Sequence, residues 1–167
     1  MRRQTCLALA ILSVLALACH GKPARVSGTG FSFPVPAGWS AQTHEGVAGM
    51  LVQDQRTGVD YFLGSVDVVP LGAAAKSVDL TKLEVCQAAA AQEAQQEDLQ
   101  VDAVVIADTP LGKLCQIDAK GKDPKQAARF YVVKTAKGIW GVTCNHDPRD
   151  TAVLQVCSEI LAGWRDQ

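Results

Sequence analysis

The pattern of apolar and polar residues along the chain predicts seven strands. Short apolar or alternating runs bounded by turn residues are typical of strands. Three strands are expected before residue 71, from the stretches FSFPVPAGW, GMLVQDQ and VDYFLGSVDVV, with a turn at residues 36–38 and a hairpin connection at residues 56–58. Four more are expected later, from VDAVVIADT, GKLCQIDAK, ARFYVVKT and GIWGVTC. The last two of these form a hairpin through Lys137 and Gly138.

Two further segments show the spacing of helices. The first covers residues 77–96, where Ser77 or Asp79 can cap the N-terminus. Its apolar face recurs at steps of three or four and comprises Leu80, Leu83, Cys86, Ala90 and Ala94. The second helix follows Asp147 as the cap, with Pro148 at the first position. Its apolar stripe comprises Val153, Val156, Cys157, Ile160, Leu161 and Trp164.

The N-terminal residues have the organisation of a signal peptide. Arg2 and Arg3 give a positive start, and residues 7–18 form an apolar run in which Ser13 is the polar member. A membrane-spanning helix needs about 20 apolar residues, so this run is too short for a permanent span. We therefore expect residues 1–18 to be removed after Ala18.

Cys19 follows the expected cleavage point directly. Residues 15–19, LALAC, resemble a bacterial lipobox, although Ala16 occupies a position that usually holds a branched aliphatic residue. Residues 16–18 also satisfy the small-x-small rule of ordinary signal peptidase, which would give a soluble periplasmic protein. We predict lipidation of Cys19, because two or more acyl chains anchor a protein stably to a membrane. His20 in place of aspartate favours the outer membrane over the inner membrane.

The remaining chain is long enough for one domain. Removing residues 1–18 from the 167 leaves 149 residues, and the formal charge changes from −1 to −3 because Arg2 and Arg3 are lost. No basic cluster survives that would support nucleic-acid binding. Residues 19–30, rich in small and polar residues, are predicted to form the lipidated cysteine and a tether, and residues 31–167 the globular domain.

Four of the six cysteines remain after Cys6 is removed and Cys19 is acylated. An even number in an exported chain indicates disulfides, and the four allow three connectivities. Cys144 shares a strand face with Trp140 and Val142, and Cys157 lies on the apolar stripe of the following helix. This parity favours a Cys144–Cys157 bond, which by elimination leaves Cys86 to pair with Cys115.

Candidate chemistry is sparse. Cys144, His146 and Asp147 lie close together in sequence, but a disulfide and a helix cap account for two of them, so we expect no metal site and no cofactor. The chain lacks the G-x-S-x-G and H-E-x-x-H patterns, and we assign no catalytic residue. Several aspartates lie on strands, where a pair of carboxylates could meet: Asp54, Asp60, Asp67, Asp102, Asp108 and Asp118. The three tryptophans, Trp39, Trp140 and Trp164, are expected to pack in the core or at its boundary, and if one of them is an exposed contact, Trp39 is the candidate.

The order of elements resembles the PsbP-like family and its Mog-type relatives. The resemblance rests on the opening FSFPVPAGW, in which Phe33, Pro34, Pro36, Gly38 and Trp39 match the family's first motif. It also rests on the closing hairpin and amphipathic helix at residues 129–164. The resemblance implies an α+β fold: a single-domain α/β/α sandwich with a central antiparallel sheet flanked by helices.

The family further implies accessory work that involves binding or assembling other proteins. We therefore expect a non-enzymatic envelope lipoprotein that is anchored through Cys19, faces the periplasm and binds an envelope protein. Two other classes stay open: a carrier with a ligand pocket between sheet and helix, and a hydrolase that lacks the familiar motifs.

Overall fold

The computed structural model describes residues 24–28, 30–43, 50–54, 64–71, 79–149 and 151–167. Its first five strands are β1 (Arg25–Gly28), β2 (Phe31–Pro34), β3 (Trp39–Thr43), β4 (Met50–Asp54) and β5 (Gly64–Pro70). Helix α1 (Leu83–Glu97) follows, and then β6 (Gln100–Thr109), β7 (Gly112–Lys120), β8 (Ala127–Lys134) and β9 (Ile139–His146). The chain closes with α2 (Ala152–Ala162) and the short β10 (Arg165–Asp166).

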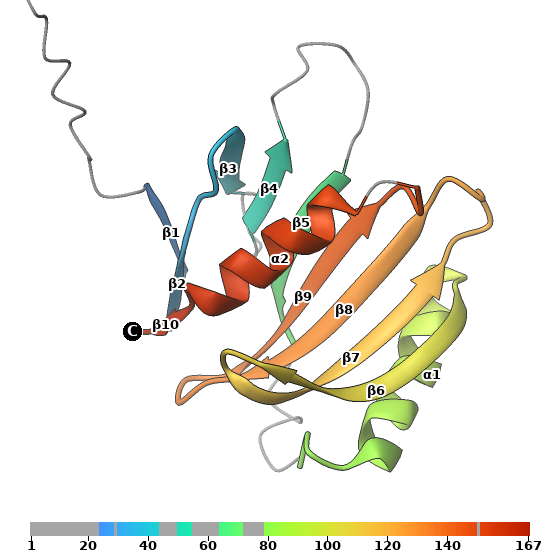
Figure 1. Cartoon of the computed structure of the whole chain (residues 1–167). Helices are drawn as coiled ribbons and strands as arrows, with labels where there is room; N and C mark the ends of the chain where they lie inside the picture. Colours follow the sequence, from blue (N-terminus) through green and yellow to red (C-terminus); the bar gives the residue numbers. More distant parts are fainter. Residues whose placement is uncertain (1–23, 29, 44–49, 55–63, 72–78, 150) are drawn as a thin grey trace, which may run out of the picture.

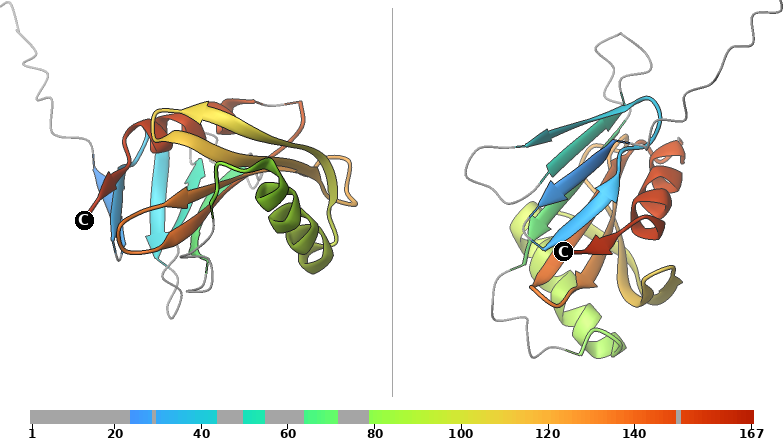
Figure 2. Two further views of the ribbon diagram at one scale, coloured as in Figure 1. Left: turned by 90° about the horizontal axis from the view of Figure 1, so that it is seen from below. Right: turned by 90° about the vertical axis from the view of Figure 1, so that its left-hand side faces the viewer.

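Seven of the strands form one sheet, in the order β3-β4-β5-β9-β8-β7-β6, and each neighbouring pair is antiparallel. A second sheet has the order β1-β2-β10. Helix α2 lies on one face of the large sheet and α1 on the other, as Figures 1 and 2 show from three directions. The arrangement is an α+β sandwich, which confirms the predicted fold class.

The larger core lies between the large sheet, α2 and the small sheet. Its fully buried members include Phe31 and Phe33 from β2, Val142 from β9 and Ile160 from α2. The ring of Phe31 packs edge-on against Trp140 with centroids 4.6 Å apart. Burial of large aromatic rings contributes strongly to a core of this kind, because each removes a wide apolar area from water.

The smaller core lies under α1. Cys86 of α1, Cys115 of β7, Val132 of β8 and Ile139 of β9 are buried there together with Leu80. Helix α1 packs mainly on β6 and β7. The part of this face over β5, β9 and β8 is therefore left beside the helix and not beneath it.

Three predictions about the course of the chain need correction. Residues 25–28 were assigned to a tether, but they form β1, which pairs antiparallel with β2. Arg25 fixes this strand, because its Nη2 donates hydrogen bonds to the carbonyl oxygens of Ser32 at 3.1 Å and Gly163 at 2.8 Å. Helix α1 begins at Leu83 because Asp79 accepts hydrogen bonds from the backbone N–H and hydroxyl of Thr81, which makes a turn.

The second helix also begins later than expected. Asp147 does not cap α2, because its carboxylate accepts hydrogen bonds from the backbone and side chain of Arg149, and the helix begins at Ala152. All six residues of the predicted stripe are buried: Val153, Val156, Cys157, Ile160, Leu161 and Trp164. The apolar face was thus predicted correctly although the cap was not.

Trp39 is buried and not an exposed contact. Its side chain is 7% exposed and belongs to the core on the α2 side of the sheet. The turn at residues 36–38, where Gly38 has a φ of 83°, brings the chain back so that the indole enters this core. Trp39 therefore packs in the core, which was the expectation for all three tryptophans, and the alternative that it is an exposed contact is wrong.

Candidate functional site

The strand register assembles one row of side chains from four strands on the α1 side of the large sheet. Ile117 of β7 lies opposite Phe130 of β8, which lies opposite Thr143 of β9, which in turn lies opposite Asp67 of β5. Side chains two residues apart share a face, so Ile117 faces the same side as Cys115, which is bonded to α1. The row changes from apolar at Ile117 and Phe130 to polar at Thr143 and Asp67.

A hydrogen-bonded cluster forms the polar half of this face. The amide nitrogen of Asn145, on β9, donates to Asp67 Oδ2 at 2.9 Å and to Ser65 Oγ at 3.2 Å. The hydroxyl of Ser65 donates to the same Asp67 oxygen at 3.2 Å. Ser65 is 3% exposed, whereas Asp67 and Asn145 are half-buried. The three contacts hold the carboxylate of Asp67 in a defined orientation at the open face.

Asp67 and Asn145 line a groove with a volume of about 450 Å³. Ala89 of α1 and Leu99, in the connection from α1 to β6, form its wall, and Phe130 and Thr143 form its floor. A volume of this size lies within the range of small-molecule sites. The groove combines an apolar wall, a half-apolar floor and an acidic edge, so it can bind a group that is apolar along its length and carries hydrogen-bond donors at one end.

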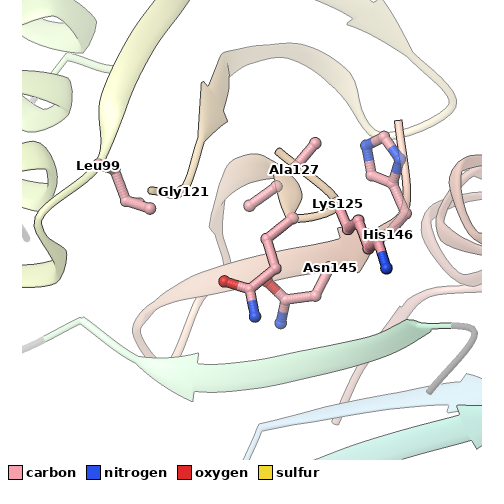
Figure 3. Close-up of a pocket in the computed structure, with 8 residues that line it drawn as sticks. Leu99, Gly121, Lys125, Ala127, Asn145 and His146 are labelled. Atoms are coloured by element: carbon pink, nitrogen blue, oxygen red, sulfur yellow. The ribbon is translucent and has the colours of Figure 1, made fainter. Parts of the chain in front are cut away.

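A smaller hollow of about 200 Å³ continues the groove toward the β7–β8 connection. The two share four lining residues: Leu99, Gln126, Ala128 and Asn145. Figure 3 shows Leu99 and Gly121 on one side of the hollow, with Lys125, Asn145 and His146 on the other. His146 Nδ1 lies 2.9 Å from the carbonyl oxygen of Asp147. The hollow thus carries basic groups, whereas the groove carries an acidic one.

The opposite face of β7 and β8 carries an ion pair. Arg129 donates from Nε to Asp118 Oδ1 at 2.6 Å and from Nη2 to Asp118 Oδ2 at 3.1 Å. The hydrogen bond to Asp118 raises the pKa of Arg129, and burial raises the pKa of Tyr131 beside it. Because two guanidinium nitrogens each donate to a different oxygen of the same carboxylate, this bidentate pair stiffens the strand pairing.

Three of the strand aspartates pair with cations. Asp102 lies 2.6 Å from Lys120 Nζ, and Asp108 lies 3.2 Å from Lys113 Nζ. With Asp118 bound to Arg129, none of these three described carboxylates forms the carboxylate pair that the sequence left open. The side chains of Asp54 and Asp60 lie outside the described residues.

The cysteines of the domain form two disulfides. Cys86 is bonded to Cys115, and Cys144 to Cys157, which is the connectivity that strand and helix parity favoured. The first bond ties α1 to β7 and the second ties α2 to β9. In the CNHD stretch, the disulfide therefore uses Cys144, and Asp147 pairs with Arg149. Hydrogen bonds from Arg149 hold the pKa of the Asp147 carboxyl well below its ordinary value.

Other sequence predictions fall outside the described residues or concern membranes. Cys19, the predicted lipidation site, lies in the undescribed N-terminal part of the chain. Within the described residues, no helix is both long and apolar enough to cross a membrane. In the same residues, no group of three or more side chains is arranged to hold a metal ion.

Sequence reasoning did not find the groove. Asp67 and Thr143 are predicted only as strand residues, and Asn145 falls just after the predicted end of the last strand, whereas β9 extends to His146. The strand order β5-β9-β8-β7 is what places these residues beside Phe130 and Ile117. Alternation within each strand assigns residues to a face, but it does not say which strands are neighbours. The sequence did contain a signal for an open polar face. Polar residues occupy every second position in strands whose intervening residues are strongly apolar.

Comparison with solved structures identifies the fold. The chain is similar to cyanobacterial PsbP, CyanoP, from Synechocystis sp. PCC 6803, with a TM-score of 0.60, 12% identity and 98% of each chain covered. It is also similar to LpqN, a protein involved in cell envelope biogenesis of Mycobacterium tuberculosis, with a TM-score of 0.53, 15% identity and coverage of 89% of this chain and 87% of LpqN. A protein from Bacteroides thetaiotaomicron VPI-5482 matches with a TM-score of 0.50 and 13% identity, over 88% of this chain and 49% of that protein.

These likenesses show that the domain has the PsbP-like fold, as the sequence predicted. No protein-family model and no curated protein sequence matches the chain. At 12–15% identity the comparisons establish the fold and leave the function to be argued from the residues.

Proposed function

We propose that this chain is an exported, non-enzymatic accessory protein of a bacterial envelope, which binds another envelope protein. The observation that carries the proposal is the PsbP-like fold shared with LpqN, a protein involved in cell envelope biogenesis. The two buried disulfides support it, because disulfides persist in oxidising compartments outside the cytosol. An accessory protein of this kind acts by binding a partner, so its function depends on its surface and not on a reactive group.

The anchor belongs to the same proposal. The signal-like residues 1–18 and the cysteine that follows them favour acylation at Cys19, with the domain facing the periplasm from the outer membrane. Radiolabelled palmitate should be incorporated into the natural chain and not into a Cys19→Ala variant. Equal labelling of the two would remove the anchor and leave a soluble periplasmic protein.

Crosslinking in intact cells tests the binding function. The natural chain should trap one specific neighbour in reproducible stoichiometry, and the trapped protein should be recovered with the reciprocal bait. Recovery of abundant lipoproteins alone, in the proportions found with an unrelated lipoprotein bait, would contradict the proposal.

A second candidate function is the carriage of a small ligand, and the groove of about 450 Å³ favours it. Native mass spectrometry of protein purified from its own cells should then show a retained adduct that is lost on denaturation. A homogeneous apo mass from freshly prepared protein would argue against a carrier and leave protein binding as the function.

A further inference from the structure

Strand β6 is a long free edge of the large sheet. It stands last in the strand order and pairs on one side, with β7. It has ten residues, whereas β3 at the other end of the sheet has five. In the described part of the chain, no backbone hydrogen bond joins the outer side of β6 to another segment. Every second residue of such a strand directs its N–H and C=O outward, which makes the edge a template for a further strand.

Exposed apolar side chains gather at the same end of the sheet. Two large apolar side chains are exposed in the described residues, Leu83 on α1 and Val105 on β6, each at 42%. Helix α1 lies along β6 and β7, as Figures 1 and 2 show. A single exposed apolar residue is ordinary, but two on neighbouring elements at one free edge indicate a surface that another protein chain covers.

The flank of α1 that faces this edge carries no charge. Cys86 points to the sheet, and Ala89 lines the groove over β8 and β9. At 3.6 residues per turn, Leu83, Gln87 and Ala91 lie on the flank opposite Ala89 and therefore toward the free edge. All three are exposed. Side chains of this kind allow a second helix to approach without bringing like charges together.

The regular part of β6 has its centre at Ile106. The register with β7 shifts between Val101 and Ala103, and the turn to β7 occupies residues 110–111, so residues 103–109 form the uninterrupted stretch. Two copies of one strand that pair antiparallel are related by a two-fold axis. An axis at Ile106 uses the whole regular stretch of both copies.

Charge also selects this axis. An axis at Ile106 places Asp108 of one copy opposite Val104 of the second copy. An axis one residue earlier, at Val105, would place Asp102 opposite Asp108 of the second copy. Like charges directly opposite each other destabilise a strand pair, so the first register is favoured.

Helix α1 fits the same axis. Cys86 is bonded to Cys115, which lies opposite Ile106, so this part of α1 stands level with the axis. Strands are about 4.8 Å apart, and a helix over the line between β6 and β7 stands half a spacing behind β6. The axes of two such helices would then be about 10 Å apart, which is within reach of ordinary helix packing. Leu83 and Gln87 would meet the same residues of the second copy there.

We propose that this chain forms a two-fold dimer, in which β6 pairs antiparallel with β6 of a second copy about Ile106 and the two α1 helices pack through Leu83. The dimer goes beyond the proposed function and does not depend on it. The groove lies on the other flank of α1 and stays open to an envelope partner. One strand and one helix flank form a small interface, so we expect a dissociation constant of about 10 μM, with monomers in dilute samples.

Sedimentation velocity tests the dimer. The exported chain carrying Cys19→Ser, with its disulfides formed, should change from monomer to dimer between about 1 and 500 μM and form nothing larger, because a two-fold interface is closed. Leu83→Lys and Val105→Lys should each weaken the association about tenfold or more, because two lysines then flank the axis of every dimer.

A matched control assigns the effect to this edge. Gln155→Lys introduces the same charge at an exposed position of α2 and should leave the association unchanged. Because Leu83 and Val105 are exposed in the monomer, dilute samples of their lysine variants should melt as the natural chain does. A short bis-maleimide should join two copies of Leu83→Cys covalently and should not join two copies of Gln155→Cys.

The outcomes separate a dimer from other uses of this edge. A monomer at every concentration, or a dimer that neither lysine variant weakens, would overturn the inference. Monomeric protein whose Leu83→Cys variant is joined to a different protein in cells would also overturn it, since the edge would then bind a strand of another chain. If Val105→Lys removes the dimer while cells trap the same envelope partner, both the dimer and the proposed function stand.

Discussion

The two helices are attached to the same sheet by one disulfide each, but they cover it very differently. Helix α2 buries five of its eleven residues against the sheet: Val153, Val156, Cys157, Ile160 and Leu161. Helix α1 has fifteen residues, and among its described side chains Cys86 and Ala90 are buried, while the larger Leu83 is 42% exposed. The α2 face carries the larger core, with a hollow of about 250 Å³ beside Leu114, Val133 and Trp164, and the α1 face combines a small core with the larger groove of about 450 Å³.

This difference suggests that one face of the sheet mainly stabilises the fold and the other mainly binds a partner. Burial of large apolar side chains is the main source of folding free energy, so the α2 face should determine the global stability of the domain. Regions with few buried apolar contacts open at lower free energy, and ligand-binding segments are commonly found among them. The face with the weaker core is also the face with the groove.

The largest expected effect comes from the core under α2. Ile160→Ala removes a fully buried side chain and should lower the free energy of unfolding by about 4 kcal/mol through lost burial and a residual cavity. Leu83→Ala, the matched change on α1, should stay within about 0.5 kcal/mol because Leu83 is 42% exposed. Urea unfolding monitored by tryptophan fluorescence measures both, and similar losses in the two variants would remove the contrast between the faces.

Removing each disulfide should destabilise a different part of the domain. The loop-entropy relation gives about 3.6 kcal/mol for Cys86–Cys115 and about 3 kcal/mol for Cys144–Cys157, from sequence separations of 29 and 13 residues. Because α1 has little packing of its own, Cys86→Ala with Cys115→Ala should release α1 while the rest of the sheet stays folded. Cys144→Ala with Cys157→Ala should instead lower protection across the whole domain.

Hydrogen exchange followed by mass spectrometry distinguishes these two results. In the first double variant, amides of residues 83–97 should exchange at nearly unfolded rates, while β9 and α2 remain protected. Uniform loss of protection in that variant would show that α1 is an integral part of the global fold and not a separately opening element.

A smaller effect is expected where the start of α2 meets the edge of the sheet. Gly64 has a φ of 154°, and a Cβ there would collide with Val153 of α2 and with the carbonyl oxygen of Asn145. Gly64→Ala should therefore lower the free energy of unfolding by about 2 kcal/mol. Gly112→Ala, where no atom lies within 4 Å of the added Cβ, should cost about 1 kcal/mol from backbone strain alone. A thermal melt that ranks the two variants in the reverse order would refute this packing account.

The smallest expected effect is a pH dependence at the loop before α2. Hydrogen bonds from Arg149 lower the pKa of Asp147, so the pair contributes stability above the ordinary carboxyl pKa of about 4 and loses it as pH falls through the lowered value. Asp147→Asn should lower the melting temperature slightly at pH 6, and the difference should shrink as pH falls from about 4 toward 2. A difference that is constant over this range would assign the effect to something other than ionisation.

Most of the fold was predictable because its elements carry strong local signals. Strand β7 begins and ends where the alternation of GKLCQIDAK predicted, and the stripe of α2 is buried in full. Strand β1 was missed because Val26 is the apolar residue among its four, and its stability comes from backbone pairing with β2 and from Arg25. The starts of both helices shifted because Asp79 and Asp147 bond to nearby Thr81 and Arg149 in place of capping a helix.

The groove was not predictable, because it depends on the order of strands. The row that forms the groove floor comprises Ile117, Phe130, Thr143 and Asp67. Asp67 and Thr143 are 76 residues apart in the sequence, and the pairing of β5 with β9 is what makes them neighbours. Trp39 was misjudged for a related reason, since the turn that buries it brings together two sheets whose contact the sequence does not reveal.

The central claim is that the protein recognises its partner through the face opposite α2. A photo-crosslinking residue placed at Thr143, on the groove floor, is compared in living cells with the same residue at Gln116, which hydrogen-bonds to Asp118 on the other face. The account predicts that Thr143 crosslinks to one specific protein and that Gln116 does not. A specific crosslink from Gln116 with none from Thr143 would contradict it.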